Sequence, residues 1–455
     1  MYCFVVAWFR PRRCGHRQSG SSLSKTVTNA ALYLNVQSAK EFALKLLGRP
    51  EERVAVALSF MYFVLLLAAY YAIRPVRDAF LVGLGTAEIK YLVAAVFFVM
   101  LAIAPLFGFL MAHVPRRKLL PAIYAFFVLN LIAFAIAFAT PGLGAWPARL
   151  FYVWVTVFNM FVASVFWSFM ADIWREEQGR RLFGFIAAGG SVGGLLGPTL
   201  AQSFAKGIGA SGVTLLAALM LSGTVVCLLL LAKIAPNNAA QNTQSEKAFS
   251  GSSWQGVILV ARSPFLLGIA LLLVVGVVTA QFSYAETARL AKEAFDSPEA
   301  RTMFFARLDF WTNVIALILQ AGVVGALTTR FGIVAPLVGL AIIAFFAYGA
   351  LALSPVLMTL GLSNIARRSA EFGVGKPARD MLYTVATPQE KYLAKNVIDT
   401  VVSRGGDVVG SWIYSVLTML GVGLAGFGAI SAATMIGATF IALAIAQGYR
   451  RRGGK

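Results

Sequence analysis

A cluster of charged residues between positions 367 and 380 carries the clearest chemical signal in the chain. Six charged side chains lie there among apolar residues: Arg367, Arg368, Glu371, Lys376, Arg379 and Asp380. A charged side chain at the centre of a bilayer costs about 2.5–3.5 kcal/mol on insertion scales, so such groups usually face a cavity or a partner. Guanidinium groups bind phosphate and carboxylate groups through paired hydrogen bonds. The cluster therefore predicts either an anion-binding site or a network of ion pairs between helices with a structural role.

The spacing within this cluster places two of its arginines on one side of a helix. Arg368 and Arg379 are eleven residues apart, about three turns, which puts them about 16 Å apart on one face. Gly373, Gly375 and Pro377 are expected to interrupt the helix, as in transporter helices that shape a binding site. The residues predicted to bind a substrate in this segment are Arg368, Glu371, Lys376 and Arg379.

A second charged cluster ends the first long apolar stretch, in the sequence Arg74-Pro-Val-Arg-Asp78. Arg74 and Asp78 are four residues apart, so they are expected to pair on one helical face. This pairing would leave Arg77 available for a ligand. The alternative is the end of a helix at the membrane surface, with arginines that extend towards water.

Two further groups of charges predict gates. The segment from Gly108 to Lys118 resembles the cytoplasmic loop that follows the second helix of major facilitators, and its arginines would pair with an acid such as Asp172. The alternative is that they only set the topology. Asp399, Arg404 and Asp407 either pair with the 367–380 cluster or form a gate of their own. The predicted gate residues are Arg116, Arg117, Asp172, Arg404 and Asp407.

The composition indicates which elements must position these charges. Of the 455 residues, 59% are hydrophobic and 13% are charged, about half of the ~25% charged residues of a soluble protein. The net charge of +20 is spread over loops and tails, as the positive-inside rule predicts for a membrane protein, so nucleic acid is not an expected partner. Three cysteines and two histidines offer no disulfide framework, zinc site or histidine-based catalysis. We expect no cofactor and no metal.

Apolar stretches long enough to cross a bilayer predict an all-α membrane protein with twelve transmembrane helices in two six-helix halves. They lie at about 53–73, 91–111, 119–140, 148–171, 183–205, 212–234, 264–285, 303–329, 333–353, 355–385, 396–420 and 424–447. The predicted parts are a basic extension (1–52), the first half (53–234), a polar linker (235–263), the second half (264–447) and a basic tail (448–455). Basic loops place both termini in the cytoplasm. A short amphipathic helix at the membrane surface is expected at 31–47.

Glycines suggest that the two halves are repeats. Gly189, Gly190 and Gly194 recur at the same spacing as Gly405, Gly406 and Gly410, and Gly108 matches Gly325 within one residue of that offset. This favours duplicated halves of the major facilitator type over coincidence. The glycine run at 189–197 predicts close helix packing and not a phosphate loop, because no Gly-Lys-Ser/Thr ending follows it. No ATPase signature is present, so transport would be secondary.

Three stretches resemble the ATP/ADP carrier (nucleotide transporter) family, in its bacterial branch within the major facilitator superfamily. They are residues 74–78, residues 166–190 and the segment Lys376-Pro-Ala-Arg-Asp-Met381. The resemblance covers about residues 50–447 and implies twelve helices and nucleotide exchange without hydrolysis. It assigns ligand-binding roles to the basic residues Arg77 and Arg379. Two functional glutamates of the family fall near Val155/Thr156 and at Gln281, where this chain carries no acid.

The prediction is a secondary transporter, and not an enzyme, that moves nucleotides or a related organic anion by alternating access. One alternative is a major facilitator transporter for an unrelated small solute. Another is a protein that transports no solute, such as a lipid scramblase or a membrane scaffold. We expect a multi-pass monomer in the lipid bilayer of a bacterial inner membrane, with an anionic small molecule as its substrate.

Overall fold

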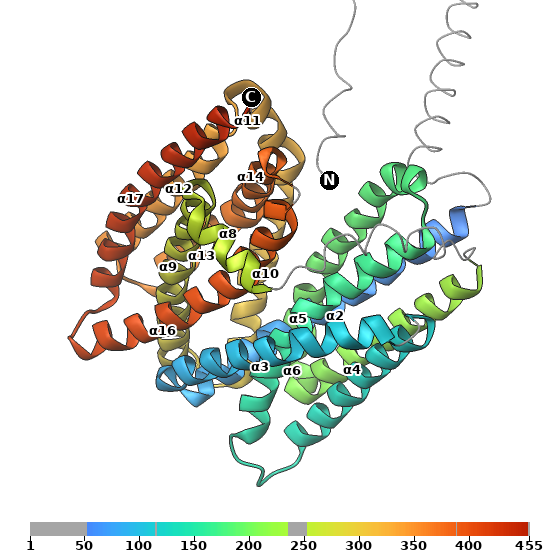
Figure 1. Ribbon diagram of the computed structural model, residues 1–455. Helices are drawn as coiled ribbons and strands as arrows, with labels where there is room; N and C mark the ends of the chain where they lie inside the picture. The colour runs from blue at the N-terminus through green and yellow to red at the C-terminus, as the bar shows by residue number, and fades with distance from the viewer. Residues whose placement is uncertain (1–51, 114–115, 235–252, 388, 454–455) are drawn as a thin grey trace, which may run out of the picture.

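A computed structural model describes residues 52–113, 116–234, 253–387 and 389–453, and these ranges contain helices and no strand (Figure 1). The all-α membrane fold predicted from the composition is therefore confirmed for this part of the chain. The predicted surface helix at 31–47 and most of the polar linker lie outside the described residues.

The first group of helices, blue to green in Figure 1, comes from the first half of the chain. Its members are α2 (Arg53–Leu84), α3 (Thr86–His113), α4 (Arg116–Ala139), α5 (Trp146–Ile173) and α6 (Glu176–Ile234). The 59 residues of α6 would extend about 88 Å as one helix, far beyond the ~30 Å hydrocarbon core of a bilayer. Gly209 divides α6, because its φ of 64° is a left-handed conformation that glycine adopts without strain.

The second group, yellow to red, is built from longer helices and several short pieces. It consists of α8 (Ser253–Arg262), α9 (Pro264–Ala294), α10 (Pro298–Ile318), η2 (Leu319–Val323), α11 (Val324–Phe331), α12 (Val334–Leu353), α13 (Leu357–Ala370), η3 (Glu371–Gly375), α14 (Lys376–Leu382), η4 (Tyr383–Val385), η5 (Glu390–Ala394), α15 (Lys395–Val397), η6 (Ile398–Val402), α16 (Ser403–Met419) and α17 (Leu424–Arg451). The helices α9 and α10 start alike: Ser263 and Ser297 each accept a hydrogen bond from an amide in the first turn, and each is followed by proline. Both are favourable helix starts.

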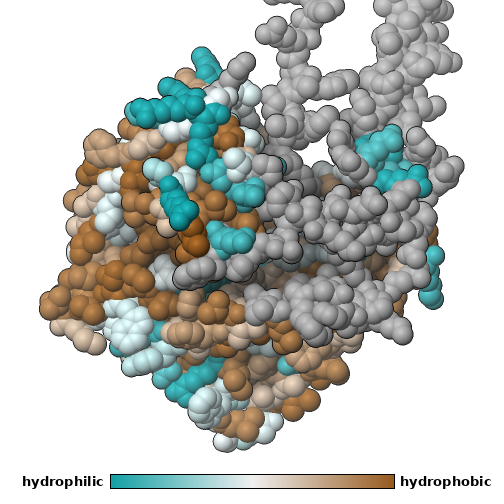
Figure 2. Space-filling view, viewed as in Figure 1, coloured by the Kyte–Doolittle hydropathy of each residue, from teal (hydrophilic) through white to brown (hydrophobic). Residues whose placement is uncertain are grey.

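Nine helices among the described residues are long and apolar enough to cross a membrane, and one of them is the divided helix α6. The segments 357–385 and 389–419, broken into short α, π and 3₁₀ pieces, are not among the nine. The count of twelve therefore stays a prediction. Large apolar side chains such as Phe98, Leu129 and Phe346 are about two-thirds exposed, and Figure 2 shows apolar residues over much of the visible surface. Such a surface suits contact with lipid.

Glycines bring α6 and α2 into backbone contact, as the glycine run predicted. A Cβ atom at Gly197 would lie 2.6 Å from the carbonyl oxygen of Ala68, and one at Gly193 would meet the carbonyl oxygen of Val64. In the second half, a Cβ at Gly410 of α16 would lie 2.9 Å from Val278 of α9. Of the matched glycines, Gly190 faces α2 and Gly406 faces α9, whereas Gly405, the match of Gly189, has open space around it, so the repeat stays a prediction.

Three large apolar clusters and a small fourth one organise the interior of the described part of the chain. The first draws its residues from α2, α4, α5 and α6, with Trp174 and, from α10, Ala306 added, and the second draws its residues from the second half of the chain, from Val260 to Ala446. The third joins both groups of helices and includes Leu81, Phe282 and Phe427. Leu81 and Phe427 lie near the end of α2 and the start of α17, and Phe282 lies within α9, so the third cluster packs the two groups of helices together.

Candidate functional site

A cavity of about 420 Å³ lies among α2, α9, α10, α12, α13, α16 and α17 and the broken segment 371–382. Its charged lining consists of five arginines and three carboxylates: Arg74, Arg367, Arg368, Arg379, Arg404, Asp78, Glu371 and Asp407. A second cavity of about 230 Å³ adjoins it and is lined mainly by α2, α3, α5 and α9. Five residues line both cavities: Arg74, Gln281, Tyr284, Arg404 and Asp407.

The broken segment brings the 367–380 cluster to the larger cavity. Helix α13 ends at Ala370, one π-helical turn follows at Glu371–Gly375, and Pro377 lies in the first turn of α14. A Cβ at Gly373 would lie 2.7 Å from Leu319 of η2 and 3.1 Å from the carbonyl oxygen of Ala316 of α10, so glycine allows the close approach of these two elements. The interruption predicted from Gly373, Gly375 and Pro377 is confirmed, and π-turns of this kind are frequent at functional sites.

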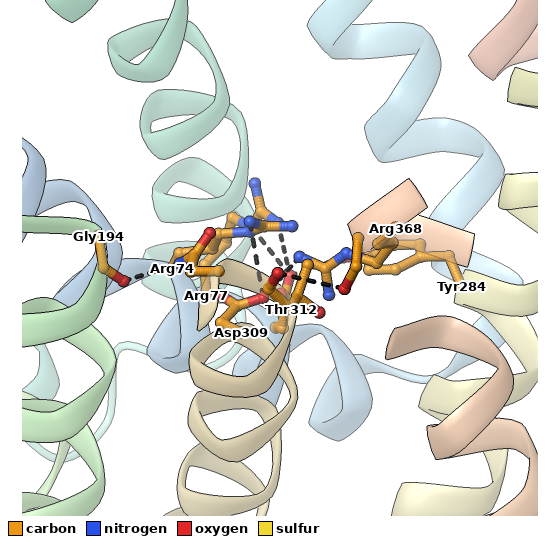
Figure 3. Close-up of polar contacts among 10 residues, drawn as sticks. Arg74, Arg77, Gly194, Tyr284, Asp309, Thr312 and Arg368 are labelled. Atoms are coloured by element: carbon orange, nitrogen blue, oxygen red, sulfur yellow. Dashed lines mark hydrogen bonds and ion pairs between the residues drawn. The ribbon is translucent and has the colours of Figure 1, made fainter. Parts of the chain in front are cut away.

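Asp309 of α10 connects arginines from both groups of helices (Figure 3). Its Oδ1 atom accepts a hydrogen bond from Nη2 of Arg368 at 2.6 Å and lies 3.6 Å from Nη1 of Arg74. Asp309 is 2% exposed. The sequence analysis did not single it out, although a lone carboxylate inside the apolar stretch 303–329 was the available signal.

Arg77 is paired and not free, so the expected pairing of the second charged cluster was wrong. Its Nε and Nη2 atoms donate to Oδ1 of Asp78 at 3.0 and 2.7 Å, and Nη1 donates to Thr156 at 3.3 Å. The hydroxyl of Tyr284 donates to the same carboxylate oxygen at 2.8 Å. Asp78 therefore pairs with Arg77, while Arg74 turns to Asp309. Arg77 lines the smaller cavity and not the larger one.

The other predicted residues of the broken segment divide into two sets. Arg379 donates a hydrogen bond to Glu371, and both line the larger cavity, as does Arg368. Lys376 is exposed and lines neither cavity. The structure therefore brings Arg368, Glu371 and Arg379 together around one space and leaves Lys376 outside it.

Gln281, Arg404 and Asp407 meet where the two cavities adjoin. Nε2 of Gln281 donates to Asp407 at 2.6 Å, and Nη1 of Arg404 donates to the other carboxylate oxygen at 3.0 Å. The family resemblance places a functional glutamate at position 281, where this chain carries glutamine. Here Asp407 of α16 supplies a carboxylate beside that position. Of the two readings for Arg404 and Asp407, pairing with the 367–380 cluster is not observed, because their ion pair is with each other.

The remaining predicted gate lies apart from the cavities. Asp172, near the end of α5, is half-buried and lines neither cavity. The side chains of Arg116 and Arg117 are not among those described. The gate formed by these three residues stays a prediction.

Three polar atoms in the lining of the larger cavity are buried without a hydrogen-bond partner in the described part of the chain. They are Nε of Arg367, Oε1 of Gln281 and the hydroxyl of Tyr348. Buried polar groups are nearly always satisfied, so an unpaired set around one space indicates room for a polar ligand or water. The described part of the chain also contains no group of three or more His, Cys, Asp or Glu side chains that could hold a metal ion.

The fold is that of solved membrane transporters. A POT family transporter in complex with a thioalcohol-conjugated peptide superposes with a TM-score of 0.63, at 13% identity, over 88% of this chain and 97% of that one. The nucleoside transporter NupG superposes with a TM-score of 0.60, at 12% identity, over 87% of this chain and 99% of NupG. These similarities show that the chain shares the helical fold of these two transporters.

The family follows from the sequence match. Residues 138–448 match the model of the TLC ATP/ADP transporter family, and the chain belongs to that family. The ADP,ATP carrier protein 1 of Chlamydia pneumoniae is 22% identical over 317 residues, 60% of this chain and 61% of the relative. The chain thus matches about three-fifths of the length of this curated relative.

Proposed function

We propose that this protein is a secondary transporter that moves nucleotides of the ATP/ADP type, or a related organic anion, across a membrane. The observation that carries the proposal is the larger cavity, into which five arginines from both groups of helices project. Guanidinium groups bind the oxygens of phosphates in pairs, and a dry cavity strengthens these contacts.

The arrangement of charges suits an exchanger. Four of the five arginines have carboxylate partners: Asp309 for Arg74 and Arg368, Glu371 for Arg379 and Asp407 for Arg404. Without a ligand, these carboxylates neutralise the arginines. A phosphate group would compete with them for the same guanidinium hydrogens, so binding would rearrange contacts that join the two halves. This is a physical route from binding to alternating access.

The predicted frame belongs to the same proposal. We place the halves at 53–234 and 264–447, with both termini in the cytoplasm of a bacterium and the chain acting as a monomer in the inner membrane. Arg77, Gln281 and Thr156 around the smaller cavity are proposed to contact the substrate when the halves move. Membership of a transporter family supports transport over catalysis.

The alternative is a major facilitator transporter for an unrelated small solute. The solved structures of similar fold include a POT family transporter in complex with a peptide conjugate and a nucleoside transporter, and fold alone does not select a substrate. The arginine-rich lining favours the anion.

The test is ligand binding by the purified full chain, followed by uptake in proteoliposomes. ATP, ADP, AMP, phosphate, sugar phosphates and dicarboxylates are compared by thermal stabilisation, since a ligand that binds the folded state raises its stability. We expect a shift with ATP or ADP that Arg379→Ala lowers several-fold in apparent affinity. Arg379→Lys keeps a charge for Glu371 but loses the planar guanidinium, so it separates loss of binding from loss of folding.

The matched control is Arg330→Ala, because Arg330 is exposed at the end of α11 and lines neither cavity. It should leave both the thermal shift and uptake unchanged. A folded protein that responds to no nucleotide but takes up another solute, with or without Arg379, would establish the alternative.

A further inference from the structure

The hydroxyl of Tyr348 is an unpaired polar group in the lining of the larger cavity. Tyr348 lies on α12, lines the cavity and is 1% exposed. Its hydroxyl has no hydrogen-bond partner among the described residues. Leaving a buried hydroxyl unpaired is unfavourable, and phenylalanine would fill the same place without this penalty. The tyrosine therefore indicates a partner that arrives with the ligand.

Aliphatic side chains line the larger cavity between Tyr348 and the Glu371–Arg379 pair. On α12, one face presents a stripe of residues at helical spacing: Leu337, Leu340, Ala341, Ala344 and Tyr348. Opposite them, α9 contributes Leu272, Leu273 and Val277, and α17 contributes Met435 and Ala438. An inorganic anion gains nothing from such walls. A flat ring with a polar edge would contact them with its faces and the hydroxyl with its edge.

The distance from this end to the arginines can be measured along α12. Leu340 lies at the level of the Glu371–Arg379 pair, because a Cβ at Gly375 would be 2.6 Å from Leu340 and 2.8 Å from Glu371. Tyr348 is eight residues further along α12, about 12 Å at 1.5 Å per residue. Ser363 of α13 donates to the carbonyl oxygen of Ala347 at 2.6 Å. Because α13 runs antiparallel to α12, Arg367 lies about one turn from Ala347 in the direction of Leu340, between Tyr348 and the Glu371–Arg379 pair.

We propose that this end of the cavity, the Tyr348 subsite, binds the base of a nucleotide whose phosphates lie among Arg367, Arg368 and Arg379. The inference rests on the proposed function and narrows it to anions that carry a heterocyclic ring. The tyrosine hydroxyl donates to a ring nitrogen or carbonyl oxygen of the base, or accepts from an exocyclic amine. A phosphate chain without a base fills only the arginine end.

The test compares ATP with inorganic tripolyphosphate, which carries the charges without the base. Dissociation constants are measured for the purified full chain and for Tyr348→Phe, which removes only the hydroxyl. We expect Tyr348→Phe to weaken ATP roughly five- to tenfold, the equivalent of one hydrogen bond, and to leave tripolyphosphate unchanged. The free variant should be at least as heat-stable as the parent, because the hydroxyl it loses has no partner.

Two further variants sharpen the result. Ala344→Leu adds a larger side chain one turn from Tyr348 on α12. It should exclude ATP from the Tyr348 subsite while tripolyphosphate still binds. Tyr449→Phe is the control, because the Tyr449 hydroxyl lies near Thr384 and outside both cavities, and it should change neither affinity.

The outcomes separate this inference from the proposed function. The subsite is refuted if tripolyphosphate binds the parent as tightly as ATP, or if Tyr348→Phe leaves ATP affinity unchanged while Arg379→Ala lowers it. In those cases the anion transporter stands. If the folded parent binds neither ATP nor tripolyphosphate nor any other anion of the panel, both proposals fail.

Discussion

Replacing Asp309 by asparagine removes the negative charge that lies between Arg74 and Arg368. The shape of the side chain is nearly kept, so the change tests charge and not packing. Its carboxylate is 2.6 Å from one guanidinium and 3.6 Å from the other. With an effective dielectric constant of about 20, each of these attractions amounts to about 5–6 kcal/mol before the cost of burial is subtracted.

The net effect is smaller because burying three charges is itself costly. Removing one partner of a buried ion pair usually destabilises a protein by about 3–5 kcal/mol, since an uncompensated charge remains. Asp309→Asn leaves two arginines facing each other, so we expect a loss in the upper part of this range. The double variant Asp309→Asn/Arg368→Gln should lose less than the sum of the two single variants, by about 1–3 kcal/mol.

The assay is chemical and thermal unfolding of the four proteins in detergent, with and without tripolyphosphate. The polyanion should stabilise Asp309→Asn more than the parent, because it meets two arginines that have lost their carboxylate. Glu293→Gln is the control: its pair with Arg289 is similarly short at 2.8 Å but exposed, so it should cost at most about 1 kcal/mol. Additive losses in the double-mutant cycle, together with a polyanion effect equal to that of the parent, would refute the reasoning.

Two other predictions concern the frame around the site. Gly193→Ala should destabilise the protein by about 1–3 kcal/mol, because the added methyl group would meet the α2 backbone. The control is Gly207→Ala, which should not destabilise the protein because Gly207 has open space around it. The midpoints of unfolding of the two variants are compared. Burial raises the pKa of Glu390, which precedes the predicted span 396–420, but the Thr387 amide and the Arg452 guanidinium outweigh this and hold the pKa below its ordinary value. The contacts of the ionised Glu390 stabilise the fold above about pH 4.3, and this stabilisation is lost as the pH falls through the lower folded-state pKa. Arg452→Gln should therefore flatten the acid limb of a stability-against-pH curve. An unchanged limb would show that the contact between Glu390 and Arg452 contributes nothing.

The features that the sequence could predict are those set within one segment. Low charge and long apolar stretches require a membrane protein, because such a chain cannot cover a water-facing surface. The break at Gly373–Pro377 follows from local backbone chemistry, and so does the packing role of the glycines in α6. The position of Arg368 and Arg379 at a cavity followed from the cost of charge in lipid.

Pairing across helices could not be predicted in this way. Arg77 was expected to be free, but whether it or Arg74 meets Asp78 depends on how α2 is rotated against α9 and α10. Asp407 restores a carboxylate beside Gln281 from a helix more than a hundred residues away in the chain. Helical periodicity determines which residues share a face of one helix, not which face of another helix opposes it.

What the sequence by itself determined is therefore the all-α membrane class of the protein, its long apolar stretches and the presence of an arginine-rich segment that must avoid lipid. Only the tertiary structure decided which charges neutralise each other and which groups remain unpaired. Arg367 and Tyr348 were not distinguishable in the sequence from their neighbours. They stand out because helix depth and rotation place their polar atoms in one cavity without partners, and these two quantities arise from packing over the whole fold.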